Sequence, residues 1–354
     1  MKRQMLLLAA LLMVGLGAWA QKAEQKFNPK KFQVYAVGFY NQENLFDTCH
    51  DAGKNDYEYL PAKGWNSEKY TSKLKNMSRA LADMGTDVLP DAGCAFIGLA
   101  EVENANVLRD LTAQPPLKAR NMQFCHIEGP DKRGIDCALL YNPALFTVKN
   151  VKLVPYVQEL AKDSAFYTRG FLTVRGEMAG DDVAVIVCHW PSQFSGSFYR
   201  ESGARQTKAV KDSLLRLNPE MKVFVMGDMN DDPTNKSMHE VLRAKPEISE
   251  VGEGDMYNPW YNILAKEEKG TLYYRGKWNL FDQIVLTPNL LSRDGKKKGY
   301  HSLKYWNHQV FRRDYLIQQE GRYQGAPLRT KAGGKWLNGY SDHLPVVLYL
   351  VKKK

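Results

Sequence analysis

Short apolar runs recur along the chain, separated by polar or glycine-containing breaks. Runs of this length predict buried strands rather than helices. We therefore expect strands at residues 32–41, 94–102, 135–142, 147–154, 171–178, 182–190, 222–230, 281–287 and 343–351.

Helical periodicity appears between some of these runs. Residues 67–84 begin at a potential N-cap, Ser67, and then repeat apolar residues at helical spacing. Residues 203–217 and 237–244 have a similar pattern, whereas the polar stretch 47–65 predicts a long loop. Strands with interspersed helices and no clear linker favour one layered α/β domain.

The first residues carry a different pattern. A basic start is followed by a short apolar run that ends at Ala18-Trp19-Ala20. This pattern predicts a cleaved secretory signal over residues 1–20, a flexible leader over 21–31 and a single catalytic domain over 32–354. No cysteine follows the run as a lipid-attachment site, and no later stretch approaches the roughly 20 apolar residues of a membrane span. We expect a secreted or periplasmic protein.

Composition adds an expectation about partners. The chain is 44% hydrophobic and 25% charged, which is typical of a globular protein. Its net charge is +10, and loss of Lys2 and Arg3 with the signal leaves +8, which favours an anionic partner such as nucleic acid. Five cysteines without CxxC spacing indicate neither a disulfide scaffold nor a zinc site. Nothing indicates an obligate protein partner, so we expect a monomer.

Polar side chains gather at the ends of the predicted strands. Because loops at strand ends are free to hold polar groups, several such ends predict one functional rim. Four strands end, and two begin, on carboxylate, amide or imidazole groups: Asn41 with Glu43, Glu101, His189, Asp228 with Asn230, then Asp282, and Asp342 with His343. Taken singly, each is also consistent with a strand-end turn or a packed loop residue, and a lone strand-end acid favours that structural role.

The residue types narrow the chemistry. Oxygen ligands such as Asn41, Glu101 and Asp342 suit a hard cation, Mg²⁺ or Mn²⁺, with Ca²⁺ also possible. Two histidines near acids suit general acid or base catalysis near neutral pH. The set fits metal-assisted attack of water on a phosphate ester.

The ordered motifs resemble those of the endonuclease/exonuclease/phosphatase superfamily, which has the DNase-I-like fold. They are "FYNQENLFD", "GLAEVEN", "RGIDCALLYNP", "CHWPS", "GDMND", "FDQIVLT" and "SDHLPV", and they span about residues 32–351. The resemblance implies a four-layer α/β/β/α sandwich, with two mainly antiparallel sheets flanked by helices. It also implies hydrolysis of phosphate esters with a divalent metal.

Roles follow from the resemblance position by position. It implies metal ligation by Asn41, Glu101 and Asp342, and catalytic roles for His189, Asp228, Asn230, Asp282 and His343. Asp282 is expected to orient His343. Supporting positions are Glu43, where other members often have Asp, and Asp136, which we expect to hydrogen-bond His189. Arg133 and Arg205 are candidates for contacts with substrate phosphate, with a solvated surface role as the alternative.

The substrate stays open at this stage. Basic charge favours a nuclease, cutting within a strand or from its end. A sphingomyelinase-like or inositol-phosphatase-like phosphoesterase is the alternative, and a membrane-acting member would carry an exposed aromatic hairpin, at residues 255–263 or 306–311. An inactive binding module is the third hypothesis, disfavoured by the intact acids and histidines. Substrate choice lies in loops that the motifs do not cover.

Overall fold

A computed structural model describes residues 31–159, 167–267, 269–292 and 299–354. The predicted signal peptide, and the predicted leader except for Lys31, lie outside the described residues. Within the described ranges, no helix combines the length and the apolar character needed to cross a membrane.

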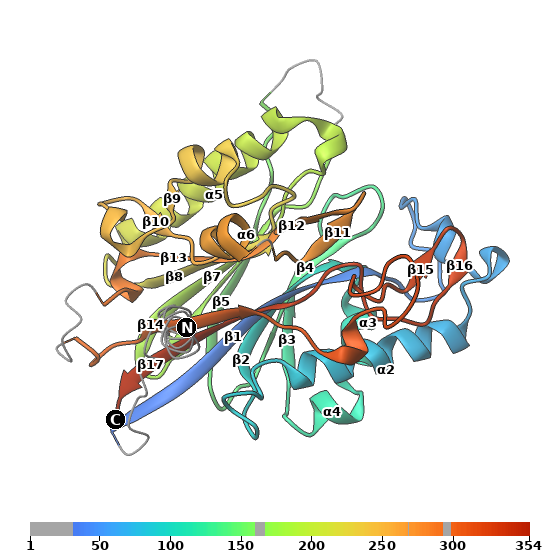
Figure 1. Cartoon of the computed structure of the whole chain (residues 1–354), viewed down its shortest axis with the longest axis horizontal. Helices are drawn as coiled ribbons and strands as arrows, with labels where there is room; N and C mark the ends of the chain where they lie inside the picture. The colour runs from blue at the N-terminus through green and yellow to red at the C-terminus, as the bar shows by residue number, and fades with distance from the viewer. Residues whose placement is uncertain (1–30, 160–166, 268, 293–298) are drawn as a thin grey trace, which may run out of the picture.

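The first sheet contains strands from both ends of the chain. β1 and β2 are parallel, and the other neighbouring pairs are antiparallel. In Figure 1, β1 (blue) runs beside β17 (red). The order across the sheet is β14 (Lys304–Val310), β17 (Val346–Lys353), β1 (Phe32–Leu45), β2 (Cys94–Val102), β4 (Asp136–Tyr141) and β3 (Gln123–His126).

The second sheet is formed by the middle of the chain. Its parallel pairs are β7 with β8 and β9 with β10. Its order is β5 (Thr147–Val154), β6 (Phe171–Met178), β7 (Asp181–His189), β8 (Lys222–Asp228), β13 (Asp282–Leu286), β10 (Met256–Tyr257) and β9 (Ala244–Lys245). Two small hairpins lie outside both sheets: β11 (Leu272–Tyr274) with β12 (Lys277–Asn279), and β15 (Lys331–Ala332) with β16 (Lys335–Trp336).

Helices connect the strands. The N-cap of α2 is Asn66, one residue earlier than expected, because the Asn66 side chain accepts a hydrogen bond from the backbone N–H of Lys69. The α-helices are α2 (Ser67–Asp83), α3 (Ala105–Thr112), α4 (Pro115–Lys118), α5 (Ser197–Leu217) and α6 (Tyr261–Glu267), with a π-helical turn η5 (Ser237–Val241). Short 3₁₀ turns are η1 (Tyr57–Tyr59), η2 (Pro61–Lys63), η4 (Gln193–Ser195), η6 (Ile248–Glu250), η7 (Pro288–Leu290) and η8 (Asp314–Leu316).

Three apolar clusters define four layers. Phe39 and Phe96 of the first sheet pack against Phe224 and other residues of the second sheet. The outer face of the first sheet packs on α2 and α3, and the outer face of the second packs on α5. Figure 1 shows α2 below one sheet and α5 above the other. The predicted α/β/β/α sandwich is confirmed.

Neither predicted aromatic hairpin exists. Residues 304–310 form β14, which pairs with β17 at the edge of the first sheet. In the other stretch, Trp260 is fully buried and donates a hydrogen bond from Nε1 to the carbonyl of Ile284. The aromatic residues of both stretches pack against the core, so neither stretch is an exposed aromatic hairpin.

Candidate active site

Strand direction brings polar ends of both sheets to one edge. β1 and β2 are parallel, so Asn41 and Glu101 come at the same end of the first sheet. In the second sheet, parallel β7 and β8 place His189 opposite Asp228. β13 is antiparallel to β8, so its first residue, Asp282, also lies opposite Asp228.

Asp228 lies at the centre of these groups. Its Oδ2 accepts a hydrogen bond from Asn41 Nδ2 at 3.0 Å. The same oxygen lies 3.7 Å from His189 Nε2 and 3.8 Å from His343 Nε2. Burial raises the pKa of Asp228, although the charge of His343 opposes the rise. A carboxylate with a raised pKa is a better proton acceptor than an exposed one.

His343 is fixed by Asp282. The Nδ1 atom of His343 lies 2.6 Å from Oδ2 of Asp282, which is fully buried. Burial disfavours the charged imidazole, but the charges of Asp282 and Asp228 outweigh it and hold the pKa of His343 well above the usual 6.5. With Nδ1 held by the acid, Nε2 is directed toward Asp228.

His189 has the opposite electrostatic setting. Its pKa is lowered well below 6.5, first by burial and then by Arg169, Arg133 and His343. Its Nε2 lies 3.8 Å from Glu101 Oε1, and its Nδ1 has no hydrogen-bond partner in the part of the chain that the structure describes. The pKa values of the two imidazoles are therefore shifted in opposite directions, which favours the neutral form of His189 and the charged form of His343.

The expected hydrogen bond from Asp136 to His189 is wrong. Asp136 Oδ2 instead lies 3.2 Å from His126 Nε2 and accepts the backbone N–H of Gly129 at 3.0 Å. Asp136 begins β4, which lies next to β2 in the first sheet, whereas His189 ends β7 in the second. Asp136 contacts His126 because β3 and β4 are neighbours in the first sheet, and this pairing cannot be seen in the sequence.

Glu101 adopts a strained backbone conformation. Its φ is 61°, in the left-handed region, which costs a non-glycine residue roughly 1–2 kcal/mol. The register of β2 shifts at this point against both neighbours, as at a β-bulge. Bulges re-aim side chains near functional sites. Here Glu101 Oε2 accepts the backbone N–H of Asn44 at 2.9 Å.

A guanidinium that the sequence analysis missed links two of the predicted acids. Arg329 donates from Nε to Glu43 Oε1 at 3.1 Å and from Nη2 to Asp342 Oδ2 at 2.8 Å. Glu43 is buried, and Lys73 lies in the same buried network. No motif marks Arg329 or Lys73, because their importance depends on contacts between residues far apart in the sequence.

The converging groups open into a cleft of about 360 Å³. Arg133 lines it, as does Arg169, which bonds to Asp131 and to the carbonyl of Trp190. Arg205 does not line it and pairs with Glu159 instead. The cleft is lined by Glu101, Asp131, Arg133, Tyr167, Thr168, Arg169, His189, Pro191, Ser192, Phe194, Ser195, Asp228, Asn230 and His343.

The donor set fits a hard divalent cation. Ligand atoms of Glu101, His189 and Asp228 all lie within 4.8 Å of one another. Carboxylate oxygens are the ligands that Mg²⁺ and Mn²⁺ prefer. Asn41 Oδ1 accepts the backbone N–H of Glu43 and keeps a second lone pair. Asp342 has one oxygen on Arg329, and its Oδ1 lies 3.9 Å from His343 Nε2.

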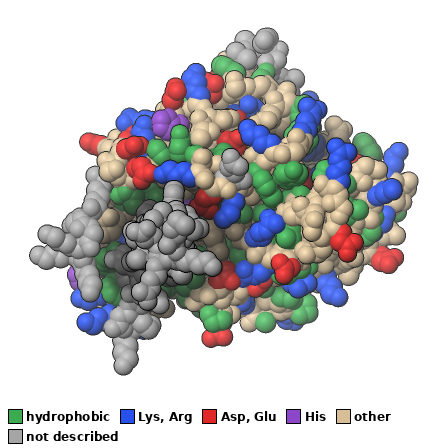
Figure 2. Space-filling view, viewed as in Figure 1, with side chains coloured by type: hydrophobic (Ala, Val, Ile, Leu, Met, Phe, Trp, Pro, Cys, Tyr) green, Lys and Arg blue, Asp and Glu red, His purple; other side chains and the backbone are tan. Residues whose placement is uncertain are grey.

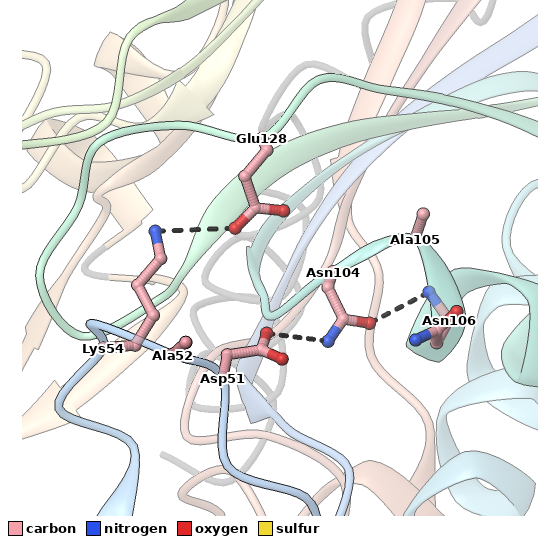
Figure 3. A pocket seen from close by; sticks show the side chains of 7 residues that line it. All are labelled: Asp51, Ala52, Lys54, Asn104, Ala105, Asn106 and Glu128. Carbon is pink, nitrogen blue, oxygen red and sulfur yellow. Dashed lines mark hydrogen bonds and ion pairs between the residues drawn. The ribbon is translucent and has the colours of Figure 1, made fainter.

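A second hollow lies beside the start of α3 and contains none of the predicted catalytic residues (Figure 3). Its polar groups pair with one another. Asn104 Nδ2 donates to Asp51 Oδ2 at 3.0 Å, and Lys54 Nζ lies 3.4 Å from Glu128 Oε1. None of the converging strand-end groups lines this hollow, so we place the candidate site in the first cleft.

Comparison with solved structures gives the same architecture. An endonuclease/exonuclease/phosphatase family protein from Bacteroides thetaiotaomicron is 15% identical, with a TM-score of 0.54 over 91% of this chain and 96% of that chain. A mannosyl-6-phosphatase from Bacteroides thetaiotaomicron is 14% identical, with a TM-score of 0.54 over 89% and 99%. TDP2 from D. rerio, complexed with a single-strand DNA product, is 13% identical, with a TM-score of 0.52 over 90% and 98%.

At these identities the structural likeness shows the fold alone. A comparison with curated proteins gives no match. The sequence profile of the Endonuclease/Exonuclease/phosphatase family matches residues 36–352, nearly the whole described chain. Together with the sandwich and the converging strand ends, this match shows that the chain belongs to the endonuclease/exonuclease/phosphatase family.

Proposed function

We propose that the protein is an exported, divalent-metal-dependent phosphodiesterase that acts on nucleic acid. The family consists of hydrolases of phosphate esters, and the observation that carries the proposal is the arrangement around Asp228. Two imidazoles with opposite pKa shifts flank one buried carboxylate, with Glu101 beside them. Such a set can hold a cation, activate water and bind the anionic phosphate.

The residues divide the chemistry among them. A cation bound at Glu101, with Asn41 and Asp342 as further ligands, would supply charge stabilisation for the phosphate oxygens. Asp228 orients the attacking water and accepts its proton, and Asn230 assists in holding the phosphate. His343, charged and fixed by Asp282, binds a phosphate oxygen. His189 holds or transfers a proton on the other side of Asp228.

The cleft supports a polymeric substrate with bases. Arg133 is half exposed at the cleft, where a guanidinium can bind a phosphate. Phe194 lines the same cleft and is 99% exposed. Exposed aromatic rings beside cationic groups are the surfaces on which bases of single strands stack. TDP2 from D. rerio, a similar fold, has been seen with a DNA product.

An activity panel tests the proposal. We expect hydrolysis of single-stranded DNA or RNA with Mg²⁺ or Mn²⁺ and its loss in EDTA. Mannose 6-phosphate, inositol phosphates and sphingomyelin serve as the competing substrates. Turnover of one of these in preference to nucleic acid would overturn the substrate class, and full activity in EDTA would overturn the metal dependence.

Glu101→Gln provides the matched variant. Loss of the carboxylate charge should abolish hydrolysis and weaken Mn²⁺ binding in titration calorimetry, because a neutral amide is a poorer ligand for a hard cation. The fold should persist, since Glu101 lies at a strand end and not in an apolar cluster. Unchanged Mn²⁺ affinity together with unchanged turnover would remove Glu101 from the metal site.

A further inference from the structure

We propose that Arg329 is an internal cation that joins Glu43 to Asp342 and thereby limits the catalytic centre to one divalent ion. Arg329 acts as a positioning residue, because it contacts the acids and not the substrate. The inference rests on the proposed metal-dependent function. It adds to that function the number of divalent ions that the site binds, and it names Arg329 as the residue that limits this number.

Arg329 spans two acids from distant parts of the chain. Glu43 lies near the end of β1, and Asp342 lies just before β17. The guanidinium donates to both, from Nε to Glu43 Oε1 at 3.1 Å and from Nη2 to Asp342 Oδ2 at 2.8 Å. Two carboxylates held this close together offer oxygen ligands that could bridge a second divalent ion. Here the guanidinium occupies the position between them.

The Glu43 carboxylate has both oxygens engaged. Oε1 accepts from Arg329, and Oε2 accepts the backbone N–H of Thr330 at 2.6 Å. The side chain is 5% exposed, so solvent does not compete for it. A metal ion could bind Glu43 only after breaking charge-assisted hydrogen bonds, which are the stronger class of hydrogen bond.

A second buried cation completes the local charge balance. Lys73 on α2 is fully buried, and its Nζ donates a hydrogen bond to Thr330 Oγ1. The same Nζ donates a second hydrogen bond to the carbonyl of Tyr340, at 2.5 Å. Its charge acts on Glu43 and Asp342 through space. The two acids are therefore matched by two fixed cations, Lys73 and Arg329, which leaves no net negative charge there to attract a further divalent ion.

Glu101 differs from Glu43 and Asp342, the two acids that Arg329 joins. It accepts the backbone N–H of Asn44, and no Lys or Arg forms an ion pair with it among the described residues. Its carboxylate can give its charge to a metal ion without displacing a cation. Glu101 is thus free of Lys and Arg, and Asp342 keeps Oδ1 for the same ion, whereas Glu43 has both oxygens engaged.

Metal stoichiometry tests the inference without measuring activity. Titration calorimetry with Mn²⁺ on the full chain should give one bound ion for the wild type. Arg329→Met, which removes the charge but keeps a long side chain, should bind a second ion at the vacated bridge. Electron paramagnetic resonance of the Mn²⁺-loaded variant should then show a spin-coupled pair that the wild type lacks.

Two further variants make the result specific. Glu43→Gln combined with Arg329→Met should bind one ion again, because one of the two bridging acids is gone. Arg243→Met, which breaks a different arginine–carboxylate pair, with Asp255, should leave the stoichiometry at one. Circular dichroism checks that each variant is folded.

The outcomes separate this inference from the proposed function. Two ions bound to the wild type would overturn the inference and leave the metal-dependent function intact, and this measurement needs no variant. One ion bound to folded Arg329→Met would equally overturn it. No ion bound to the wild type would overturn the proposed function.

Discussion

At the scale of single residues, the site depends on backbone conformations that side-chain chemistry does not reveal. Glu43, Asn44, Glu101 and Asn230 all have φ between 47° and 61°. Non-glycine residues in this region persist where the surrounding structure holds them, and they cluster at functional sites. The motifs identify these residues, but the strain that aims them becomes visible only in the fold.

The two histidines have distinct expected effects on catalysis and stability. His189→Ala and His343→Ala should each lower turnover by about 10²-fold or more, the usual contribution of a general acid or base. Initial rates from pH 5 to 9 measure this. A variant that keeps wild-type rates throughout would have a structural histidine at that position.

The raised pKa of His343 should make the stability of the fold depend on pH. A histidine whose pKa is higher in the folded state stabilises the fold fully below about 6.5, its unfolded value. That contribution is lost as pH rises through the higher folded pKa. The melting temperature of His343→Gln, measured in EDTA, should therefore fall further below wild type at pH 6 than at pH 9. An equal gap at both pH values would contradict a raised pKa.

Phe194 should contribute to substrate binding rather than to chemistry. Stacking of a base on an aromatic ring is worth about 1–3 kcal/mol, so Phe194→Ala should raise KM for an oligonucleotide by roughly tenfold with kcat little changed. Phe198→Ala is the control, since Phe198 lies nearby on α5 and does not line the cleft. A KM increase of the same size with an abasic oligonucleotide would exclude base stacking.

At the scale of elements, the long buried strands and α2 could be predicted because burial leaves a clear period in the sequence. β2 and β5 have the bounds expected. The two-residue strands β9, β10, β15 and β16 could not be predicted, since so short a segment has no period. β14 is only partly buried, and its sequence predicts an exposed aromatic segment rather than a strand.

Gly227 shows how an element positions a catalytic group. It lies in β8 next to Asp228, and a Cβ there would come within 2.1 Å of the Cys188 carbonyl oxygen in β7. Gly227→Ala should cost about 1–3 kcal/mol in chemical denaturation, as overpacking does, and should also lower kcat by displacing Asp228.

Gly38→Ala in β1 is the matched control. Its closest contact would be Met84 Cε at 2.4 Å, the end of a flexible side chain that can move. The control should lose less stability and retain its kcat. Equal losses in the two variants would contradict a special role for the β7–β8 spacing.

At the scale of the whole molecule, net charge predicts a class of partner but not its place. In Figure 2, Lys and Arg side chains are interspersed with Asp and Glu across the face in view. The sequence could not show this distribution, because side chains far apart in the chain meet on the surface. Any preference for nucleic acid therefore depends on local groups at the cleft as well as on overall charge.

Salt dependence measures how far phosphate contacts dominate binding. Glu101→Gln, which should bind without cleaving, is expected to lose roughly 10²-fold in affinity for single-stranded DNA between about 50 and 200 mM salt, the loss that about five neutralised phosphates produce. Fluorescence anisotropy with a labelled oligonucleotide provides the measurement. A flat response would favour a small phosphorylated substrate.

The chain order of the two sheets has a consequence for engineering. Residues 32–141 and 304–353 build the first sheet, with Phe32 paired to Lys353, while residues 147–286 carry the whole second sheet. Because the two ends of the described chain are neighbours, the chain nearly closes on itself. We call the part that builds the first sheet the first arc and the part that builds the second sheet the second arc. The first arc carries Glu101 and His343, and the second carries His189 and Asp228. Joining Lys353 to Phe32 through a linker and opening the chain on both sides of the second arc would yield two fragments that are each incomplete, and hydrolysis would then signal that the two had associated.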